Sequence, residues 1–312
     1  MAKLNPIPGL LPEVEVASKF RMDAEATVFA GDCMDLLRQI PDGVADLVVT
    51  SPPYNIGKKY EKRLDLDGYI ADQACVIREC VRTLSPSGNI CWQIGNYVDY
   101  GAIIPLDIVL FPIFAGCGLR MRNRIVWHFE HGLHCSKRLS GRYEVIIWFT
   151  KSDDYIFDVD MIRVPQKYPE KRYFKGPKAG QYSCNPMGKN PGDIWTIPNV
   201  KHNHVEKTAH PCQFPVELVE RLVLSMSREN GLVIDPYLGA GSTAVAALRH
   251  HRRVAGADTV DEYCRIARER IALESLGLLR TRPMSREIYS PPRNSAVSQN
   301  PFADENGGTN PP

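Results

Sequence analysis

The chain has 312 residues, of which 44% are hydrophobic and 24% charged, an ordinary globular composition whose formal net charge of +2 identifies no partner. It contains no run of 18 apolar residues and no basic-then-apolar leader, so we expect no membrane span and a cytoplasmic location. Nine cysteines without CxxC pairs indicate reduced, mostly buried thiols.

The first part of the chain alternates irregular stretches with short apolar runs. Residues 1–26 contain several prolines and predict an irregular N-terminal arm. Residues 27–30 predict a short strand, and residues 34–40 predict a short helix. Residues 44–50 are apolar and rich in β-branched side chains apart from Asp46, which is typical of a buried strand.

That strand leads directly into Ser51-Pro52-Pro53-Tyr54-Asn55. Two consecutive prolines donate no backbone hydrogen bonds and fix an extended φ, so the strand must end there. The carboxyl end of a strand is where open α/β sheets bind ligands. A stiff turn with a hydroxyl before it and an aromatic ring after it suits a flat group that carries an amine. The alternative interpretation is a surface loop with a diproline kink.

The middle of the chain adds further α/β elements. Residues 58–67 are highly charged and predict a mobile loop beside the site. Residues 70–84 have apolar side chains at helical spacing, and residues 89–94 predict another strand. Residues 103–117 are apolar enough for a buried helix, although they include two prolines. An antiparallel pair of strands at the sheet edge is expected from residues 122–129 and 143–150.

Residues 163–189 differ from the rest of the chain in their charge. They contain seven lysines and arginines against one acid, Glu170, and four tyrosine or phenylalanine rings are interleaved with them. Such a segment can follow phosphates and stack on bases, so we expect it to bind nucleic acid rather than to form a solvated loop. The candidate DNA-binding residues are Lys167, Lys171, Arg172, Lys175, Lys178 and Lys189.

Regular structure resumes in the last third of the chain. Residues 214–226 predict a periodic helix with Pro215 at its start, and residues 231–235 predict a buried strand. A turn that contains Gly239 and Gly241 follows. It leads to a helix, a strand that ends at Asp258 and a last helix, at residues 243–250, 253–257 and 261–276. Residues 279–312 are rich in Pro, Ser, Asn and Gly and predict a disordered tail.

The glycine turn has the chemistry of a nucleoside-cofactor site. Gly239 and Gly241 let the backbone approach a ligand at a helix N-terminus. Asp258 comes 17 residues after Gly241, where an acid can bind both hydroxyls of a ribose. Asp235 precedes the glycines, where it would repel a pyrophosphate and attract an ammonium group. A ligand with a ribose, an ammonium group and no phosphate is S-adenosylmethionine. The alternative is a generic glycine turn.

The sequence D-P-Y-L-G-A-G-S at residues 235–242, together with Ser51-Pro-Pro-Tyr54, resembles the motif pair of DNA amino-methyltransferases. The motif order, with the basic segment in between, is similar to that of the β class, a permuted group of this family. The resemblance covers about residues 27–276. It implies an α/β fold with a Rossmann-like, seven-stranded, mostly parallel sheet that has one antiparallel strand, and an inserted irregular target-recognition region.

The resemblance also implies a domain organisation and a set of site residues. The expected parts are an N-terminal arm (1–26), a catalytic half (27–150), the target-recognition region (151–209), a cofactor-binding half (210–278) and the tail (279–312). The implied catalytic residues are Ser51, Pro52, Pro53 and Tyr54. The implied cofactor-binding residues are Asp32, Phe214, Pro215, Asp235, Pro236, Gly239, Gly241, Ser242 and Asp258. No metal is expected.

The implied reaction is methylation of a base amine. The exocyclic amine of cytosine or adenine is a poor nucleophile, and the base must leave the duplex to react. By resemblance, Tyr54 stacks on the flipped base, while the Ser51 hydroxyl and the Pro52 carbonyl accept hydrogen bonds from the amine and orient its lone pair. Ser51 favours cytosine N4, because adenine-N6 members usually have Asp or Asn there. Asn55 is common among adenine members, so adenine N6 is the alternative.

Functions of other classes are weighed against this one. A DNA-binding module without catalysis is one, and methylation of RNA or protein is another. Cys212 resembles the nucleophile of cytosine-C5 methyltransferases, but here the glycine turn follows the cysteine instead of preceding it. His202, His204, His210 and Cys212 could form a zinc site, although their spacing matches no standard finger. For the favoured function, the candidate partners are double-stranded DNA, a cognate restriction endonuclease and a second copy of the chain in a homodimer.

Overall fold

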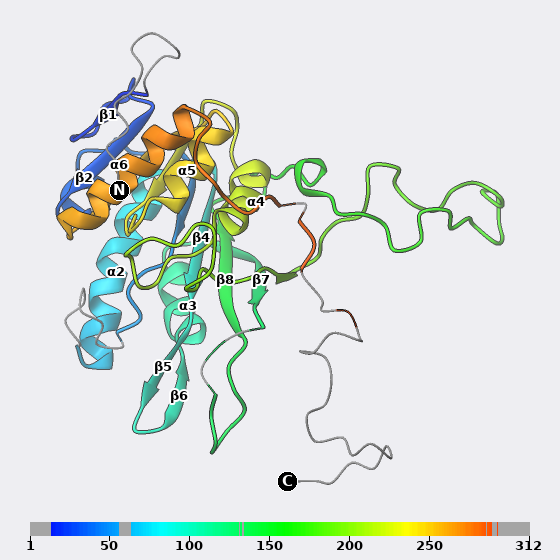
Figure 1. Cartoon of the computed structure of the whole chain (residues 1–312), viewed down its shortest axis with the longest axis horizontal. Coiled ribbons are helices and arrows are strands. Elements are labelled where there is room, and N and C mark those ends of the chain that lie inside the picture. Colours follow the sequence, from blue (N-terminus) through cyan, green and yellow to red (C-terminus); the bar gives the residue numbers. More distant parts are fainter. Residues whose placement is uncertain are drawn as a thin grey trace.

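The computed structural model describes residues 14–55, 64–130, 132, 134–284, 286–288 and 292. A central sheet is covered by helices on both faces (Figure 1). Two buried hydrophobic clusters fill the space on either side of that sheet. A long, irregular segment, residues 163–189, projects from this body, and we call it the basic arm (Figure 1).

The main sheet has nine strands. Their order across the sheet is β1 (Val16–Ala17), β2 (Ala26–Ala30), β11 (Arg253–Asp258), β10 (Leu232–Asp235), β3 (Ala45–Thr50), β4 (Leu84–Ile94), β8 (Tyr143–Thr150), β7 (Arg120–His128) and β9 (Ile194–Thr196). Neighbouring strands are parallel except at β4–β8 and β8–β7, so within the described residues β8 alone is reversed. The predicted mostly parallel sheet with one reversed strand is therefore confirmed, but it has nine strands instead of seven. The short β1 and β9, which carry too few residues to show a pattern, extend it at its two edges.

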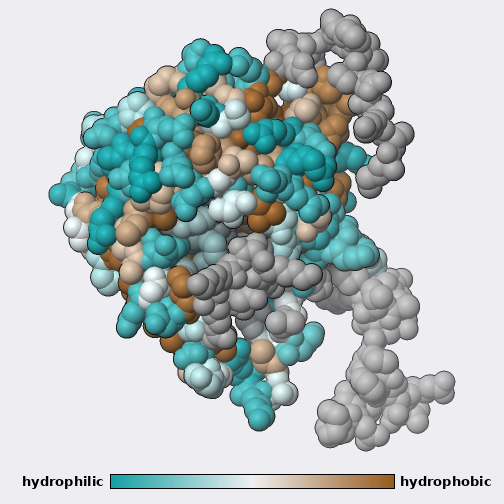
Figure 2. Space-filling view, turned by 90° about the vertical axis from the view of Figure 1, so that its left-hand side faces the viewer, coloured by the Kyte–Doolittle hydropathy of each residue, from teal (hydrophilic) through white to brown (hydrophobic). Residues whose placement is uncertain are grey.

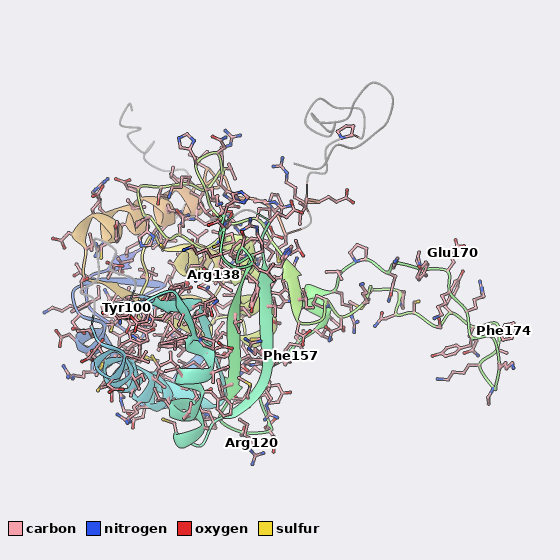
Figure 3. All side chains as sticks on the ribbon, turned by 90° about the horizontal axis from the view of Figure 1, so that it is seen from below. Tyr100, Arg120, Arg138, Phe157, Glu170 and Phe174 are labelled. Atoms are coloured by element: carbon pink, nitrogen blue, oxygen red, sulfur yellow. The ribbon has the colours of Figure 1, made fainter. Side chains whose placement is uncertain are left out.

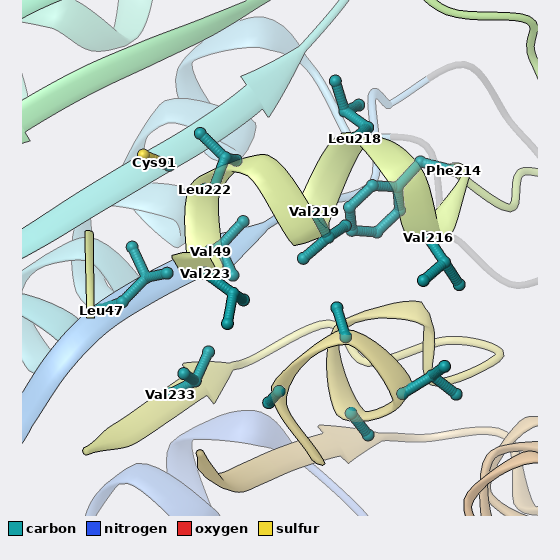
Figure 4. Packing of buried hydrophobic residues seen from close by; sticks show 14 of the residues in the cluster. Leu47, Val49, Cys91, Phe214, Val216, Leu218, Val219, Leu222, Val223 and Val233 are labelled. Carbon is teal, nitrogen blue, oxygen red and sulfur yellow. The ribbon is translucent and has the colours of Figure 1, made fainter. Parts of the chain in front are cut away.

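Alternation along β3 explains why both faces of the sheet are covered. Successive side chains of a strand point to opposite faces, and Leu47 and Val49 lie in one cluster while Val48 lies in the other. The first cluster is completed by α4 (Val216–Met226), α5 (Ser242–Arg249) and α6 (Asp261–Ser275). The second is completed by α1 (Cys33–Leu37), α2 (Leu66–Thr83) and α3 (Leu106–Gly116). Figure 4 shows the first cluster, where α4 packs over β3.

Two predictions about the middle of the chain need correction. The helix expected at 103–117 begins only after Pro105, because its first residues form β6 (Ala102–Pro105), which pairs with β5 (Asn96–Asp99) in a separate hairpin. Pro105 is extended at the N-cap, a position that needs no intrahelical N–H. The strands β7 and β8 are antiparallel as predicted, but they do not form the edge of the sheet, because β9 pairs with β7. A short 3-10 turn (Asp160–Ile162) precedes the basic arm.

Parts of the predicted terminal and loop segments lie outside the described residues. These parts are residues 1–13 of the predicted N-terminal arm, residues 58–63 of the predicted charged loop and most of the predicted C-terminal tail. Inside the predicted N-terminal arm, β1 pairs with β2. At the start of the predicted tail, Arg282 is only 7% exposed and bonds to Glu217 and Glu206, so the chain packs onto the domain at least as far as this arginine.

The surface and the cysteines complete the description of the fold. The side that carries β1, β2 and α6 is mainly hydrophilic with scattered hydrophobic residues (Figure 2). In the part of the chain that the structure describes, no helix combines the length and the apolar character needed to cross a bilayer. All nine cysteines are unpaired, as predicted, but only Cys33, Cys80, Cys91 and Cys264 are buried, so the prediction of mostly buried thiols holds for four of the nine.

Candidate active site

A cavity of about 560 Å³ lies at the carboxyl ends of β3, β10 and β11. These strands are parallel neighbours with β10 between the other two, so the loops that follow them meet at one edge of the sheet. The Ser51–Tyr54 turn, the glycine turn after β10 and Asp258 at the end of β11 all line the cavity. Two motifs that are far apart in the sequence thus face one space.

The Ser-Pro-Pro-Tyr turn is held by one hydrogen bond within the turn and one to β8 of the sheet. Ser51 Oγ lies 3.3 Å from Tyr54 Oη, and Tyr54 Oη donates to Glu144 Oε2 at 3.2 Å. Burial and the nearby Glu144 raise the pKa of Tyr54 well above its ordinary value, so the phenol stays protonated. A side chain at Gly95 would place its Cβ 3.0 Å from the Tyr54 ring, so this glycine makes room for the ring.

Asn55, the last residue of this turn, is tied to Leu64 by two hydrogen bonds. Its φ of 57° lies in the left-handed region, which asparagine tolerates better than most residues. Its amide nitrogen donates to the Leu64 carbonyl at 2.8 Å, and its amide oxygen accepts from the Leu64 N–H at 2.7 Å. The buried Asn55 side chain therefore joins the two ends of the segment 56–63 at the cavity.

The two glycines of the glycine turn make room for different neighbours. Gly239 and Gly241 have φ values of 52° and 76°. A Cβ at Gly239 would lie 3.1 Å from Nε2 of His210, and a Cβ at Gly241 would lie 2.8 Å from the Cβ of Ala267 on α6. The first glycine therefore admits the histidine ring, and the second lets the turn pack closely against α6.

Asp258 ties the glycine turn to the neighbouring strands. Its Oδ2 accepts from the Gly239 N–H at 3.1 Å, and its Oδ1 accepts from the Val260 N–H at 2.8 Å. Its carbonyl accepts from the Gly31 N–H at 2.9 Å, next to Asp32, which caps α1. Burial raises the pKa of Asp258, and its two backbone hydrogen bonds oppose that rise. The carboxylate is thus held at the cavity wall with lone pairs left to accept from a ligand.

Asp235 lies behind the cavity wall. It is 0% exposed, and it is not among the residues that line the cavity. Its Oδ1 accepts from the Thr50 hydroxyl at 2.5 Å, and its Oδ2 accepts from the Thr243 hydroxyl at 2.5 Å. Burial raises its pKa to about 6. This carboxylate joins β3, β10 and α5, and the geometry does not present it to the ammonium group that the sequence assigned to it.

The cavity is rich in carboxylates. Asp32, Asp72 and Asp258 line it together with Glu144. The pKa of Asp72 is raised, mainly by burial and to a smaller extent by the negative charge of Asp32. Such walls disfavour a phosphate and favour a ligand with cationic groups. The volume is that of a site for a small-molecule cofactor. These features fit S-adenosylmethionine, which carries a sulfonium and an ammonium group and no phosphate.

Comparison with known proteins assigns the chain to a family. A family profile described as DNA methylase, of the N6/N4 type, matches residues 45–269. The chain is a DNA methyltransferase of the N6/N4 amino-methyltransferase family. Type II methyltransferase M.BglII of Bacillus subtilis is 50% identical over 253 residues, which cover 81% of this chain and 70% of that protein. DNA adenine methyltransferase YhdJ of Escherichia coli (strain K12) is 30% identical over 259 residues, 80% of this chain and 83% of that protein.

Solved structures of methyltransferases match the fold. The PvuII DNA methyltransferase (cytosine-N4-specific) aligns with a TM-score of 0.63 over 81% of this chain and 92% of that chain, and its 19% identity supports the fold alone. A putative DNA modification methylase from Thermus thermophilus, complexed with S-adenosyl-L-methionine, aligns with a TM-score of 0.57 and 26% identity over 80% and 96% of the two chains. S-adenosyl-L-methionine is the cofactor of this family.

Most of the predicted catalytic and cofactor-binding residues of this methyltransferase line the cavity. The lining includes Ser51, Pro52, Pro53, Tyr54, Asp32, Phe214, Pro236, Gly239, Ser242 and Asp258. The remaining predicted cofactor residues, Pro215, Asp235 and Gly241, do not line the cavity. Pro215 is the N-cap of α4, and Gly241 is the N-cap of α5, so these two position the helices that flank the site.

Glu144 is a cavity residue that sequence reasoning missed. It is the second residue of β8, and the reversed direction of β8 brings its first residues to the edge where the parallel strands end. Its carboxylate accepts from Tyr54 and from the amide of Gln93. The signal in the sequence was a single acid at the start of the apolar run 145–149. It becomes informative only once the reversal of that strand is known.

His210 is a second cavity residue whose role was missed. Its ring lies against Gly239 and makes an edge contact with Tyr263, with ring centroids 4.4 Å apart. Burial, with the charges of Lys207 and Arg270, lowers the pKa of His210 to about 4. The histidine is therefore neutral at physiological pH, as a wall next to a cationic ligand requires.

The predicted DNA-binding residues lie away from the cavity, on the basic arm. All six are exposed, and none lines the cavity. The two sides of the arm pair at Val164–Lys189 and at Arg172–Tyr182, where the guanidinium lies 3.9 Å from the ring centroid. Glu170 and Phe174 mark the far end of the arm in Figure 3, and Phe174 is 89% exposed. The arm presents cations and rings to solvent on a partly paired backbone.

The structure does not support the alternative sites. Among the described residues, which include His202, His204, His210 and Cys212, no three metal-ligating side chains are grouped to hold a metal. Cys212 is exposed and lines the cavity, but membership of the amino-methyltransferase family argues against the C5 mechanism that would use it.

Proposed function

We propose that this protein transfers a methyl group from S-adenosylmethionine to N4 of a cytosine flipped out of double-stranded DNA. One observation carries the proposal, namely that the Ser51–Tyr54 turn and the glycine turn line a single cavity with acidic walls. A site for a base amine and a site for a nucleoside cofactor are then in the same space, which transfer between the two requires.

The glycine turn and the end of β11 form the cofactor side of the proposed site. Asp258 accepts from the ribose hydroxyls, and Gly239, Ala240 and Ser242 of the glycine turn form the adjoining wall of the site. Asp32 lies beside the adenine, and Phe214 covers the cofactor from the start of α4. The cofactor supplies an electrophilic methyl group on a positively charged sulfur.

The Ser51–Tyr54 turn forms the base side. Tyr54 stacks on the flipped base, and the Ser51 hydroxyl and the Pro52 carbonyl accept hydrogen bonds from the two amine protons. The prolines fix these acceptors in place, so the lone pair of the amine is aimed at the methyl carbon without reorganisation of the turn. Such positioning contributes up to about 7–11 kcal/mol in the best cases.

The choice of base rests on Ser51, which favours cytosine. Adenine N6 is the second candidate, and two observations favour it. YhdJ, which is 30% identical to this chain, is named a DNA adenine methyltransferase, and Asn55 is a residue common among adenine members. The names of relatives as Type II methyltransferases support a cognate restriction endonuclease as a functional partner. A second copy of the chain in a homodimer is also part of the proposal.

Mass analysis of nucleosides tests the proposal directly. Unmethylated DNA is incubated with the protein and S-adenosylmethionine, digested, and analysed for N4-methylcytosine, N6-methyladenine and 5-methylcytosine. We expect N4-methylcytosine. N6-methyladenine alone would establish the second candidate, and 5-methylcytosine alone would contradict both.

A Ser51→Ala variant separates catalysis from DNA binding. Loss of the hydroxyl removes an acceptor for the amine but no contact to the duplex backbone. We expect methyl transfer to fall by about 10²–10³-fold while DNA affinity stays at the wild-type level. If the wild-type protein binds DNA but produces no methylated nucleoside, the chain is a non-catalytic DNA-binding module. Transfer to RNA in preference to DNA, in a competition assay, would contradict the assignment of DNA as substrate.

A further inference from the structure

Three side chains form a continuous chain of oxygens inside the cavity. Ser51 Oγ lies 3.3 Å from Tyr54 Oη, which donates to Glu144 Oε2 at 3.2 Å. All three residues line the cavity. The chain runs from the hydroxyl that receives the base amine in the proposed function to a carboxylate on β8.

Glu144 is placed to take up a proton. The groups that contact its carboxylate among the described residues are the Tyr54 phenol and the Gln93 amide, and both are neutral donors. Trp127, its partner across the sheet, donates its indole N–H to the Ile197 carbonyl at 2.8 Å instead. Burial raises the pKa of Glu144, and the Gln93 and Tyr54 hydrogen bonds oppose that rise. A raised pKa lies closer to neutral pH, which suits a proton acceptor.

Methylation converts the base amine into a cation that must lose a proton. We propose that Glu144 receives this proton through Tyr54 and Ser51. The inference rests on the proposed function, because it needs an amine bound at Ser51. Glu144 acts through two other side chains and is therefore a positioning residue for the reaction.

The transfer balances in atoms and charge. The amine nitrogen forms a bond to the methyl carbon while the carbon–sulfur bond breaks and its electron pair stays on sulfur. One N–H proton then passes to Ser51 Oγ, the Ser51 proton passes to Tyr54 Oη, and the Tyr54 proton passes to Glu144. Serine and tyrosine end as they began. The sulfonium charge and the carboxylate charge are both lost, so the net charge of the site is unchanged.

This arrangement explains how a serine can occupy the first position of the motif. A serine hydroxyl accepts a hydrogen bond from the amine but cannot retain its proton, whereas a carboxylate can. In this protein the hydroxyls of Ser51 and Tyr54 lie between the base and the Glu144 carboxylate. The residue next to the base can then stay small and neutral, and the charge that removes the proton lies on β8.

The single-turnover rate of methyl transfer, measured across pH, tests the proposal. Glu144→Gln keeps the shape of the side chain and an oxygen to accept from Tyr54, but it cannot take up a proton. We expect the rate to fall about 10²-fold or more, with wild-type affinities for S-adenosylmethionine and DNA, and the acid limb of the pH profile to disappear. The other titratable groups of the cavity are unchanged in this variant, so the lost limb reports on Glu144; they are Asp32, Cys33, Tyr54, Tyr69, Asp72, Lys201, His210, Cys212, Tyr237 and Asp258.

A double-variant cycle shows whether Glu144 acts through Tyr54. Tyr54→Phe keeps the stacking ring and removes the hydroxyl that connects Ser51 to Glu144. Adding Glu144→Gln to Tyr54→Phe should therefore slow the reaction no further. The matched control is Glu229→Gln, an exposed carboxylate in the turn before β10, which should keep the wild-type rate and pH profile.

Distinct outcomes address the inference and the function beneath it. The role of Glu144 is overturned if Glu144→Gln keeps the wild-type rate and acid limb. It is also overturned if the rate losses of Glu144→Gln and Tyr54→Phe multiply in the double variant. If Glu144→Gln does not fold, the pH profile of Tyr54→Phe tests the proposal by itself. Loss of the acid limb in that variant would support proton transfer from Ser51 through Tyr54 to Glu144, and a retained acid limb would overturn it. An absence of methyl transfer by the wild-type protein would refute the proposed function instead.

Discussion

Asp235 and Asp258 end two adjacent parallel strands, but their surroundings differ. Asp258 lines the cavity and bonds to the backbone N–H groups of Gly239 in the glycine turn and of Val260, two residues after β11. Asp235 is fully buried and accepts from Thr50, Thr243 and the Tyr237 N–H. The first carboxylate is available to a ligand, whereas the second stabilises the junction between the two motifs. The sequence presents both only as acids next to a glycine turn.

Replacement of the buried acid should change how stability depends on pH. Burial raises the pKa of Asp235 to about 6 in the folded protein, above the value of about 3.9 in an unfolded chain. Between these values the folded state binds the extra proton, so the stability that the protonated group contributes is lost as pH rises through about 6. In Asp235→Asn this loss is absent. We expect the stability of the variant relative to wild type to rise by about 2 kcal/mol between about pH 4 and pH 7.

Urea denaturation of both proteins across this pH range measures the difference. The asparagine oxygen can still accept from Thr50 and from the Tyr237 N–H, and the Thr243 hydroxyl can turn to accept from the new amide. The hydrogen bonds are thus conserved while the charge is removed. A stability difference that does not vary with pH would contradict the assigned protonation.

At the scale of single elements, the glycine turn depends on its contact with α6. Gly241 has a φ of 76°, and an added Cβ would lie 2.8 Å from the Cβ of Ala267. Gly277, at the end of α6, has a similar φ of 66° but no atom within 4 Å of an added Cβ. An alanine at Gly277 would therefore suffer backbone strain alone, whereas an alanine at Gly241 would suffer both backbone strain and a steric clash.

Alanine at these two positions should have unequal effects. Gly277→Ala should cost about 1–2 kcal/mol for the left-handed conformation alone. Gly241→Ala should cost about 1–3 kcal/mol more, because the turn or α6 must shift. Since the turn lines the proposed cofactor site, affinity for S-adenosylmethionine should fall only in Gly241→Ala. Urea denaturation and calorimetric titration measure the two quantities, and equal losses of stability would refute the packing argument.

The basic arm should determine how DNA binding depends on salt. Lys175 and Lys178 are exposed on the arm, where neutralised phosphates would release counterions. A Lys175→Ala, Lys178→Ala variant should reduce the magnitude of the slope of log K against log salt by about 2. The matched control is Lys19→Ala, an exposed lysine between β1 and β2. Fluorescence anisotropy at several salt concentrations measures the slope, and an unchanged slope would show that DNA does not contact this part of the arm.

The elements that the sequence predicts well are those fixed by local chemistry. The diproline ends β3, and the glycines allow the turn after β10, so both loops could be assigned to the carboxyl ends of strands without a structure. Glu144 and His210 reach the cavity through the direction of β8 and the course of the loop before α4, which are properties of the assembled sheet. The sequence around Arg282 predicts a disordered tail because its neighbours are polar, and its buried acidic partners are distant in the sequence.

At the scale of the whole molecule, Arg282 connects the end of the described chain to the wall of the cavity. Its side chain bonds to Glu217 on α4, and its N–H donates to Glu206 Oε1 at 3.0 Å. Glu206 Oε2 in turn accepts from the Val216 N–H at 2.9 Å, at the start of α4 beside Phe214. Glu206 and Glu217 are 4% and 2% exposed, so both acids depend on buried partners.

Shortening the chain should test this connection. A chain that ends at residue 288 keeps Arg282 and should be as stable as the full chain. One that ends at residue 280 removes Arg282 and leaves Glu217 with the longer 3.6 Å contact to Arg221 alone, which should cost up to about 3 kcal/mol of unfolding free energy at neutral pH. Burial raises the pKa of Glu217 even in the full chain, where Arg282 opposes that rise, so loss of the arginine should raise the pKa further and the shorter chain should regain stability relative to the full chain as pH falls. Its affinity for S-adenosylmethionine should also decrease, because Phe214 lines the cavity two residues before the start of α4. Equal urea midpoints for the two chains would show that Arg282 contributes nothing to the wall.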